Sequence, residues 1–395
     1  MYHSLQMLKT SPRPPVTASQ PRVSLADLAL VFLKLGTIAF GGPAAHIAMM
    51  EDEFVRTRQW LTRSDFLDRL AAANLIPGPS STELAIFIGQ EKRGWLGLIV
   101  AGSCFILPAA IIVSFIAAAY VRFGSLPQMS GILYGIKPAV IAIILQALWN
   151  LGQTAAKTRL LIVIGVAAAA LNLLGLSPLL VLVFAALTSA VTALQKPASG
   201  ARTSLAWLFP SSLLTGGAGL AAPFSLAGLF TAFLKIGAIV FGSGYVLLAF
   251  LRTEFVERLH WLTERQLIDA VAVGQFTPGP VFTTATFIGY VLGRGRGAAV
   301  ATLGIFLPGF LLVAASGPLI RNIRRSPLAG SMLDGVVAGS LALMAVVSWQ
   351  LAKVVIVDWV TATVLLVSLV LLLRFRVNSA WLIAAGALVG WVARI

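Results

Sequence analysis

Residues 77–83 read PGPSSTE and residues 278–284 read PGPVFTT. Each Pro-Gly-Pro separates two short apolar pieces, at 65–76 and 80–91 and again at 265–276 and 280–292. A helix of about 12 residues rises about 18 Å, which is too short for a bilayer core about 30 Å thick. Because proline removes an amide donor and ends a helix, the pattern predicts a re-entrant hairpin whose break is buried in protein or faces a wet cavity. A plain loop between two short transmembrane helices is the alternative.

The two motifs belong to a duplication of the chain. Residues 32–36 (FLKLG) recur as 233–237 (FLKIG), an offset of 201. Residues 60–62 (WLT) recur at the same offset, and residues 87–89 (FIG) and 107–108 (LP) recur at an offset of 200. Matches in the same order over about 120 residues predict two equivalent halves. We expect a disordered N-terminal tail over 1–21, the two repeats over 22–195 and 222–395, and a linker over 196–221.

Composition places these halves in a membrane. The chain is 58% hydrophobic and 11% charged, whereas soluble domains are about 25% charged. The fold class expected is an all-α polytopic membrane protein. Each half should contain about five transmembrane helices and one re-entrant hairpin, and an odd number of crossings makes the halves inverted repeats.

The remaining helices are expected at matching places in the two halves. In the first half they fall at 24–50 (interrupted at 41–43), 96–121, 131–152, 158–173 and 177–194. In the second half they fall at 224–250, 297–316, 331–352, 356–373 and 379–393.

The net charge of +15 does not indicate nucleic-acid binding, because the cations are scattered over short loops between apolar segments. One cysteine and three histidines make a metal site unlikely to form, and no cofactor is predicted. The sequence has no Walker-type loop that would bind ATP.

The half-helices after each Pro-Gly-Pro suit an anion. Their first turns have free amides and the positive end of the helix dipole, and proline fits the first helical position. Hydroxyl donors follow in both halves. The candidate residues at the breaks are Gly78, Pro79, Ser80, Ser81 and Thr82 in the first half and Gly279, Pro280, Thr283 and Thr284 in the second.

Positive charge comes from Lys34 and Lys235, which lie about ten residues into apolar helices. Such intramembrane lysines are costly and usually functional. They are candidate anion ligands, and pairing with carboxylates such as Asp68 and Asp269 is the alternative.

Small residues follow about two turns later, and they either break the helix a second time or form a packing face. The candidates that we add to the anion site are Gly41, Gly42 and Gly242.

Glu83 has no equivalent in the second half, where Thr283 and Thr284 follow the Pro-Gly-Pro. A carboxyl beside an anion site can bind a coupling proton. A structural ion pair with Lys137 is the alternative, since Lys137 also has no counterpart in the second half.

The interrupted first helix at 40–43 (FGGP), the paired Pro-Gly-Pro, the two WLT motifs and the duplication resemble the chromate ion transporter family in its long, two-domain form. The resemblance covers residues 24–395. It implies efflux of chromate across the bacterial inner membrane by a multi-pass protein, with chromate resistance as the outcome and a homo-oligomer as a possible assembly. Chromium specificity rests on the resemblance alone.

We expect the membrane potential to drive this export, with protons as an additional coupling ion through Glu83. The alternatives are a channel or importer for sulfate or a related anion, and a membrane-embedded enzyme acting on lipid phosphate. The enzyme is disfavoured because the apolar helices offer almost no clustered acid–base residues.

Overall fold

The computed structural model describes residues 23–40, 42–124, 127–155, 158–194, 223–241, 246–316, 326–375 and 377–393. The predicted tail over 1–21, the linker over 196–221, Gly41 and Gly242 lie outside the described residues. Within these ranges the chain is helical, with turns and one isolated bridge between Pro77 and Phe241.

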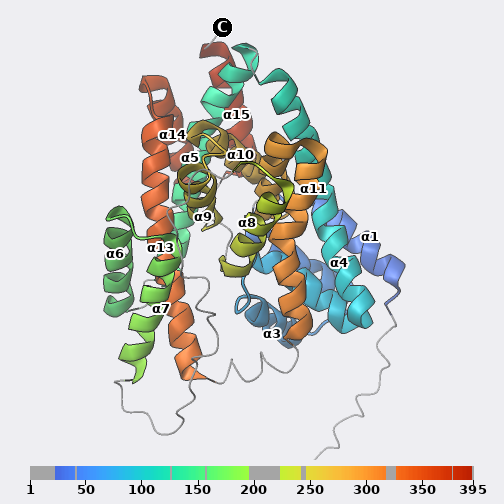
Figure 1. The fold of residues 1–395 in the computed structure, drawn as a ribbon. Helices are drawn as coiled ribbons and strands as arrows, with labels where there is room; N and C mark the ends of the chain where they lie inside the picture. The colour runs from blue at the N-terminus through green and yellow to red at the C-terminus, as the bar shows by residue number, and fades with distance from the viewer. Residues whose placement is uncertain are drawn as a thin grey trace, which may run out of the picture.

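The elements repeat in order, and their positions agree with the ranges expected from the sequence (Figure 1). Those of the first half are α1 (Leu25–Ile38), α2 (Gly42–Glu51), the π-helical η1 (Asp52–Thr57), α3 (Arg63–Ala73), α4 (Ser80–Phe123), α5 (Pro127–Ala155), α6 (Arg159–Leu173) and α7 (Pro178–Leu194). Those of the second half are α8 (Leu226–Ile239), α9 (Leu247–Leu251), the π-helical η3 (Arg252–Arg258), α10 (Glu264–Phe276), the 3₁₀ turn η4 (Val281–Thr283), α11 (Thr284–Ala315), α13 (Pro327–Val355), α14 (Trp359–Phe375) and α15 (Ser379–Ala393).

Helices α4 and α11 each fold back on themselves. The backbone leaves helical geometry at Arg93 and at Gly94, whose φ is 58°, and the same happens in α11 at Gly293 and Arg294. Gly89 then lies directly against Gly97, since a side chain at either position would overlap the other's backbone. Each half therefore has a short first segment after its break, packed antiparallel on a long second segment.

The two breaks are held by an exchange of backbone hydrogen bonds between the halves. The Gly78 amide donates to the Val240 carbonyl (2.7 Å), at the end of α8. The Gly279 amide donates to the Ala39 carbonyl (2.9 Å), at the end of α1. Donors and acceptors are related by the repeat offset of 201, so the halves meet through a pseudo-twofold contact.

Equivalent helices of the two halves run antiparallel. Gly102, near the start of the long segment of α4, lies against the Phe310 ring, near the end of α11. Val313, later still in α11, packs in one cluster with Leu98 and Ala101. Early residues of one helix meet late residues of the other, so the halves are inverted repeats. Figure 1 shows α4 and α11 side by side at the centre of this contact.

The helices farther from these breaks also pack across the two halves. Gly135 of α5 lies against the backbone of Gly386 and Gly390 in α15. Its repeat counterpart, Gly335 of α13, lies against Ala185 and Ser189 of α7. Each long helix therefore packs on the last helix of the other half, and the two repeats form one intertwined body.

Among the described residues, four helices are long and apolar enough to cross a bilayer. They are two equivalent pairs, Ser80–Phe123 with Val281–Ala315 and Gly131–Gln153 with Leu328–Val355. Five more helices of 10 to 17 residues are apolar but shorter. The protein is thus an all-α membrane protein with two homologous halves.

Glycine contacts between helices lead to a first prediction. A Cβ added at Gly36 would lie 2.5 Å from the Phe105 carbonyl oxygen, whereas Gly152 in α5 has nothing within 4 Å. Gly36→Ala should separate α1 from α4 and destabilise the protein by about 1–3 kcal/mol. Gly152→Ala should be neutral or slightly stabilising. Thermal unfolding of the two purified variants in detergent checks this, and equal melting temperatures would contradict it.

Candidate functional site

The first break presents a buried polar helix start. Pro79 caps α4, and its carbonyl accepts from the amides of Thr82 (2.6 Å) and Glu83 (3.3 Å). The amides of Ser80 and Ser81 begin the helix and are not used by this carbonyl. Their side chains, with that of Thr82, are all buried. The Thr82 hydroxyl has no hydrogen-bond partner within the described part of the chain.

Glu83 is enclosed between the two halves. Its side chain is 1% exposed, and its Oε2 has no hydrogen-bond partner among the described residues. Oε1 fills the space over Gly78, and it would lie 2.7 Å from a Cβ at Gly309 of α11. Because Gly78 has a φ of 128°, and any side chain there would also overlap Glu83, only glycine fits this break.

His46 of α2 is a site residue that sequence reasoning missed. It is buried, with Nε2 3.0 Å from the Ala39 carbonyl and Nδ1 3.3 Å from the Ser81 hydroxyl. The same carbonyl accepts from the Gly279 amide. Three hydrogen bonds therefore link the second break to the helix start after the first break, so the two breaks lie close together. The signal was a lone histidine in an apolar segment, beside the interruption at residues 41–43.

The second break repeats the Pro-Gly-Pro and its exchanged backbone hydrogen bond, but it continues into the 3₁₀ turn η4 and has different side chains. The hydroxyl of Thr283 donates to the Pro280 carbonyl (2.8 Å), and that of Thr284 donates to the Val281 carbonyl (2.8 Å). Gly279 has a φ of 89° and would meet Ala109 of α4 with any side chain. The residues expected to bind an anion here are thus buried and bonded within their own turn.

The two deep lysines form ion pairs. Lys34 is 3.2 Å from Glu53 Oε2, and Lys235 is 3.8 Å from Glu254 Oε2. Carboxylate pairing was the alternative to the anion role, and the partners are these glutamates rather than Asp68 and Asp269. The side chains of Lys34 and Lys235 are 56% and 40% exposed, whereas the hydroxyl side chains that follow each break are buried.

Ion pairing stabilises the charged form of Glu53. Partial burial raises the pKa of Glu53, but hydrogen bonds from Arg58 and Lys34 outweigh burial and hold this pKa below its ordinary value. Glu254 also pairs with Arg258. Each lysine therefore links the first helix of its half to the π-helical segment of the same half, α1 to η1 and α8 to η3.

Comparison with known proteins finds the same family match in both halves of the chain. The family model described as Chromate transporter matches residues 26–190 and again 227–391. The chain belongs to the chromate transporter family. A chromate transport protein of Cupriavidus metallidurans is 36% identical, covering 97% of this chain and 98% of its own length. A probable chromate transport protein of Synechococcus elongatus is 31% identical over 82% of this chain and 84% of its own. No solved structure was found to match the chain.

This chromate transporter family member also has a buried ion pair between its halves. Lys137 of α5 lies 2.9 Å from Asp269 of α10, and the Tyr120 hydroxyl of α4 donates to the same carboxylate (2.9 Å). Lys137 and Asp269 are 9% and 1% exposed. Lys137 is therefore paired with Asp269 and not with Glu83, the partner considered from the sequence. Sequence spacing could not reveal a pair that joins different halves.

A second prediction concerns this pair. Lys137→Met should cost about 3–5 kcal/mol of stability, because it leaves a buried carboxylate without its counter-charge. Adding Asp269→Leu should recover most of the loss, since two apolar groups replace the pair. The exposed Lys353 at the end of α13 offers the control Lys353→Met. Thermal unfolding of the four purified proteins checks this, and a double variant as unstable as Lys137→Met would overturn it.

Proposed function

We propose that this protein is a secondary transporter that exports chromate, or a closely similar tetrahedral oxyanion, across the bacterial inner membrane. The observation that carries the proposal is the buried first turn of α4, at the contact between two inverted repeats, where the Thr82 hydroxyl has no hydrogen-bond partner among the described residues. The relatives named chromate transport proteins support the choice of anion.

The chemistry of the helix start fits an oxyanion. The first amides of a helix point outward, and the dipole places about half a positive charge there. Ser80 and Thr82 add hydroxyl donors that can replace part of the anion's hydration shell. Gly42, Gly78 and Gly279 enter the proposal as positions where the backbone turns sharply or approaches closely, each with a positive φ. Lys34 and Lys235 enter it as nearby paired charges rather than as direct ligands.

The membrane potential is the proposed driving force. Chromate is mainly a dianion at neutral pH, and the cytoplasm is electrically negative. Moving one charge through about 100 mV is worth about 2.3 kcal/mol, so expelling a dianion gains about 4.6 kcal/mol. This gain corresponds to a gradient of about a thousandfold or more, since about 1.4 kcal/mol is one factor of ten. Export at this scale requires no ATP.

Everted membrane vesicles test this mechanism. Respiring vesicles that contain the protein should accumulate chromate, because their interior is positive. Collapsing the potential while the pH gradient is kept should remove most of the accumulation and leave only the part that the pH gradient drives through Glu83. Vesicles without the protein are the control.

Two outcomes would contradict the proposal in different ways. Uptake that is undiminished without a potential would exclude the electrogenic mechanism. Chromate accumulation by right-side-out vesicles, driven inward, would identify an importer instead.

Glu83 is the proposed coupling residue. A carboxylate and a dianion repel each other strongly in a low-dielectric site, so proton occupancy of Glu83 and anion occupancy are linked. Glu83→Gln should leave potential-driven uptake in place and abolish its response to an imposed pH gradient. Measuring initial uptake rates at fixed potential and varied pH gradient checks this. A response that survives in the Gln variant would assign the coupling to another group.

A further inference from the structure

Several positions that are polar at the first break are apolar at the equivalent positions of the second break. Counted from Pro-Gly-Pro, Ser80 and Ser81 correspond to Val281 and Phe282. His46 corresponds to Leu247 at the same offset of 201. The two breaks share the exchanged backbone hydrogen bonds. They differ in these side chains and in the turn that follows, which is α-helical after Pro79 and the 3₁₀ turn η4 after Pro280.

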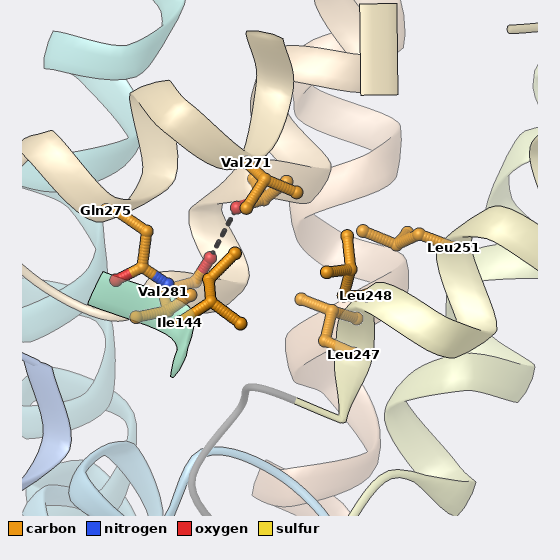
Figure 2. Close-up of a pocket in the computed structure, with 8 residues that line it drawn as sticks. Ile144, Leu247, Leu248, Leu251, Val271, Gln275 and Val281 are labelled. Carbon is orange, nitrogen blue, oxygen red and sulfur yellow. Dashed lines mark hydrogen bonds between the residues drawn. The ribbon is translucent and has the colours of Figure 1, made fainter. Parts of the chain in front are cut away.

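The second break borders a small apolar cavity. Figure 2 shows Leu247, Leu248 and Leu251 on one side and Ile144 and Val281 on the other. Val271, Gln275 and Thr284 complete the lining, and none of these residues is charged. The space is about large enough for one water molecule. A tetrahedral dianion would be too large for it and would lose its hydration without gaining donors.

At the first break, two buried polar atoms just after Pro-Gly-Pro have no hydrogen-bond partner among the described residues. Thr82 Oγ1 and Glu83 Oε2, both in side chains 1% exposed, have no partner in the part of the chain that the structure describes. Buried polar atoms are rarely left unpaired, and here two occur within the first turn of one helix. At the second break the corresponding hydroxyls of Thr283 and Thr284 are both bonded.

His46 fixes the geometry of the first break. A carbonyl only accepts, so Nε2 carries the proton that it donates to Ala39. In the neutral ring Nδ1 then accepts from the Ser81 hydroxyl. Ser81 is thereby directed toward His46, and the Thr82 hydroxyl remains as a donor without a partner among the described residues, beside the first amides of α4.

We propose that the transporter binds one oxyanion per chain, at the first break only, with Thr82 as a direct donor and His46 as a positioning residue. The second break is an apolar counterpart that supports the fold and binds no anion. This inference rests on the proposed function and refines it, because sequence symmetry alone predicts two equivalent sites.

Matched substitutions in the full-length protein, reconstituted in liposomes, separate the two breaks. Thr82→Val should raise the KM for chromate at least tenfold, because it removes a hydroxyl and keeps the side-chain shape. Thr283→Val, the same change at the corresponding position, should leave KM within twofold. Thr82→Ser keeps the donor and should recover most of the affinity lost in Thr82→Val. A melting temperature of Thr82→Val equal to that of the wild type shows that its loss is not a folding defect.

His46 is tested by its substitution pattern. His46→Leu, which introduces the residue of the second half, should raise KM, whereas His46→Gln should recover most of the affinity. A glutamine amide can donate to the Ala39 carbonyl and accept from Ser81, as the neutral ring does. A purely space-filling role would make Leu and Gln equivalent, and that result would remove the positioning role.

Binding of radiolabelled chromate to the purified protein gives the stoichiometry. One ion per chain is expected for the wild type and for Thr283→Val. Two ions per chain, or equal increases in KM for Thr82→Val and Thr283→Val, would overturn the single-site inference while chromate transport stands. Wild-type liposomes that take up no chromate would instead contradict the proposed function.

Discussion

A helix that breaks inside a bilayer leaves backbone amides and carbonyls that water cannot reach. Each such group costs several kcal/mol when unpaired in hydrocarbon. In this protein the amide of Gly78 is satisfied by a carbonyl of the second half and that of Gly279 by a carbonyl of the first. Neither half can therefore bury its own break, which is a physical reason why the two repeats are found fused and intertwined.

The exchanged backbone hydrogen bonds also determine where the candidate site lies. Because the first helix of one half ends where the break of the other half begins, the interrupted helix and the re-entrant hairpin meet at one point. A polar helix start that lies there is shielded from lipid by both repeats. Irregular backbone at membrane depth is stable only under such protein cover, so the requirement for hydrogen bonds and the requirement for a buried anion site lead to the same place.

Much of the fold followed from the sequence, because helix ends depend on local signals. Proline, glycine and the length of apolar runs placed most α-helices close to their observed ranges. They predicted neither the π-helical η1 and η3 nor the end of α8 at Ile239 within the helix expected over 224–250. The partners across the halves could not be predicted, since contacts such as Lys137 with Asp269 join residues far apart in the chain. Glu53 and Glu254, the partners of the deep lysines, do repeat at the offset of 201 and could have been noticed in the sequence. Their distance from Lys34 and Lys235 depends on the three-dimensional path of the π-helical segments, which the sequence does not give.

The candidate site departs from the symmetry that predicted it, and electrostatics gives a reason. Two dianions about 10 Å apart at an effective dielectric constant of about 20 repel each other by about 7 kcal/mol. Two equal anion sites beside one pseudo-twofold axis would thus weaken each other strongly. With the proposed single site this repulsion does not arise, since Leu247 and Phe282 stand in the second half where the first has His46 and Ser81. The exchanged backbone hydrogen bonds can stay symmetric because they use main-chain atoms, while the side chains at the proposed anion site differ between the halves.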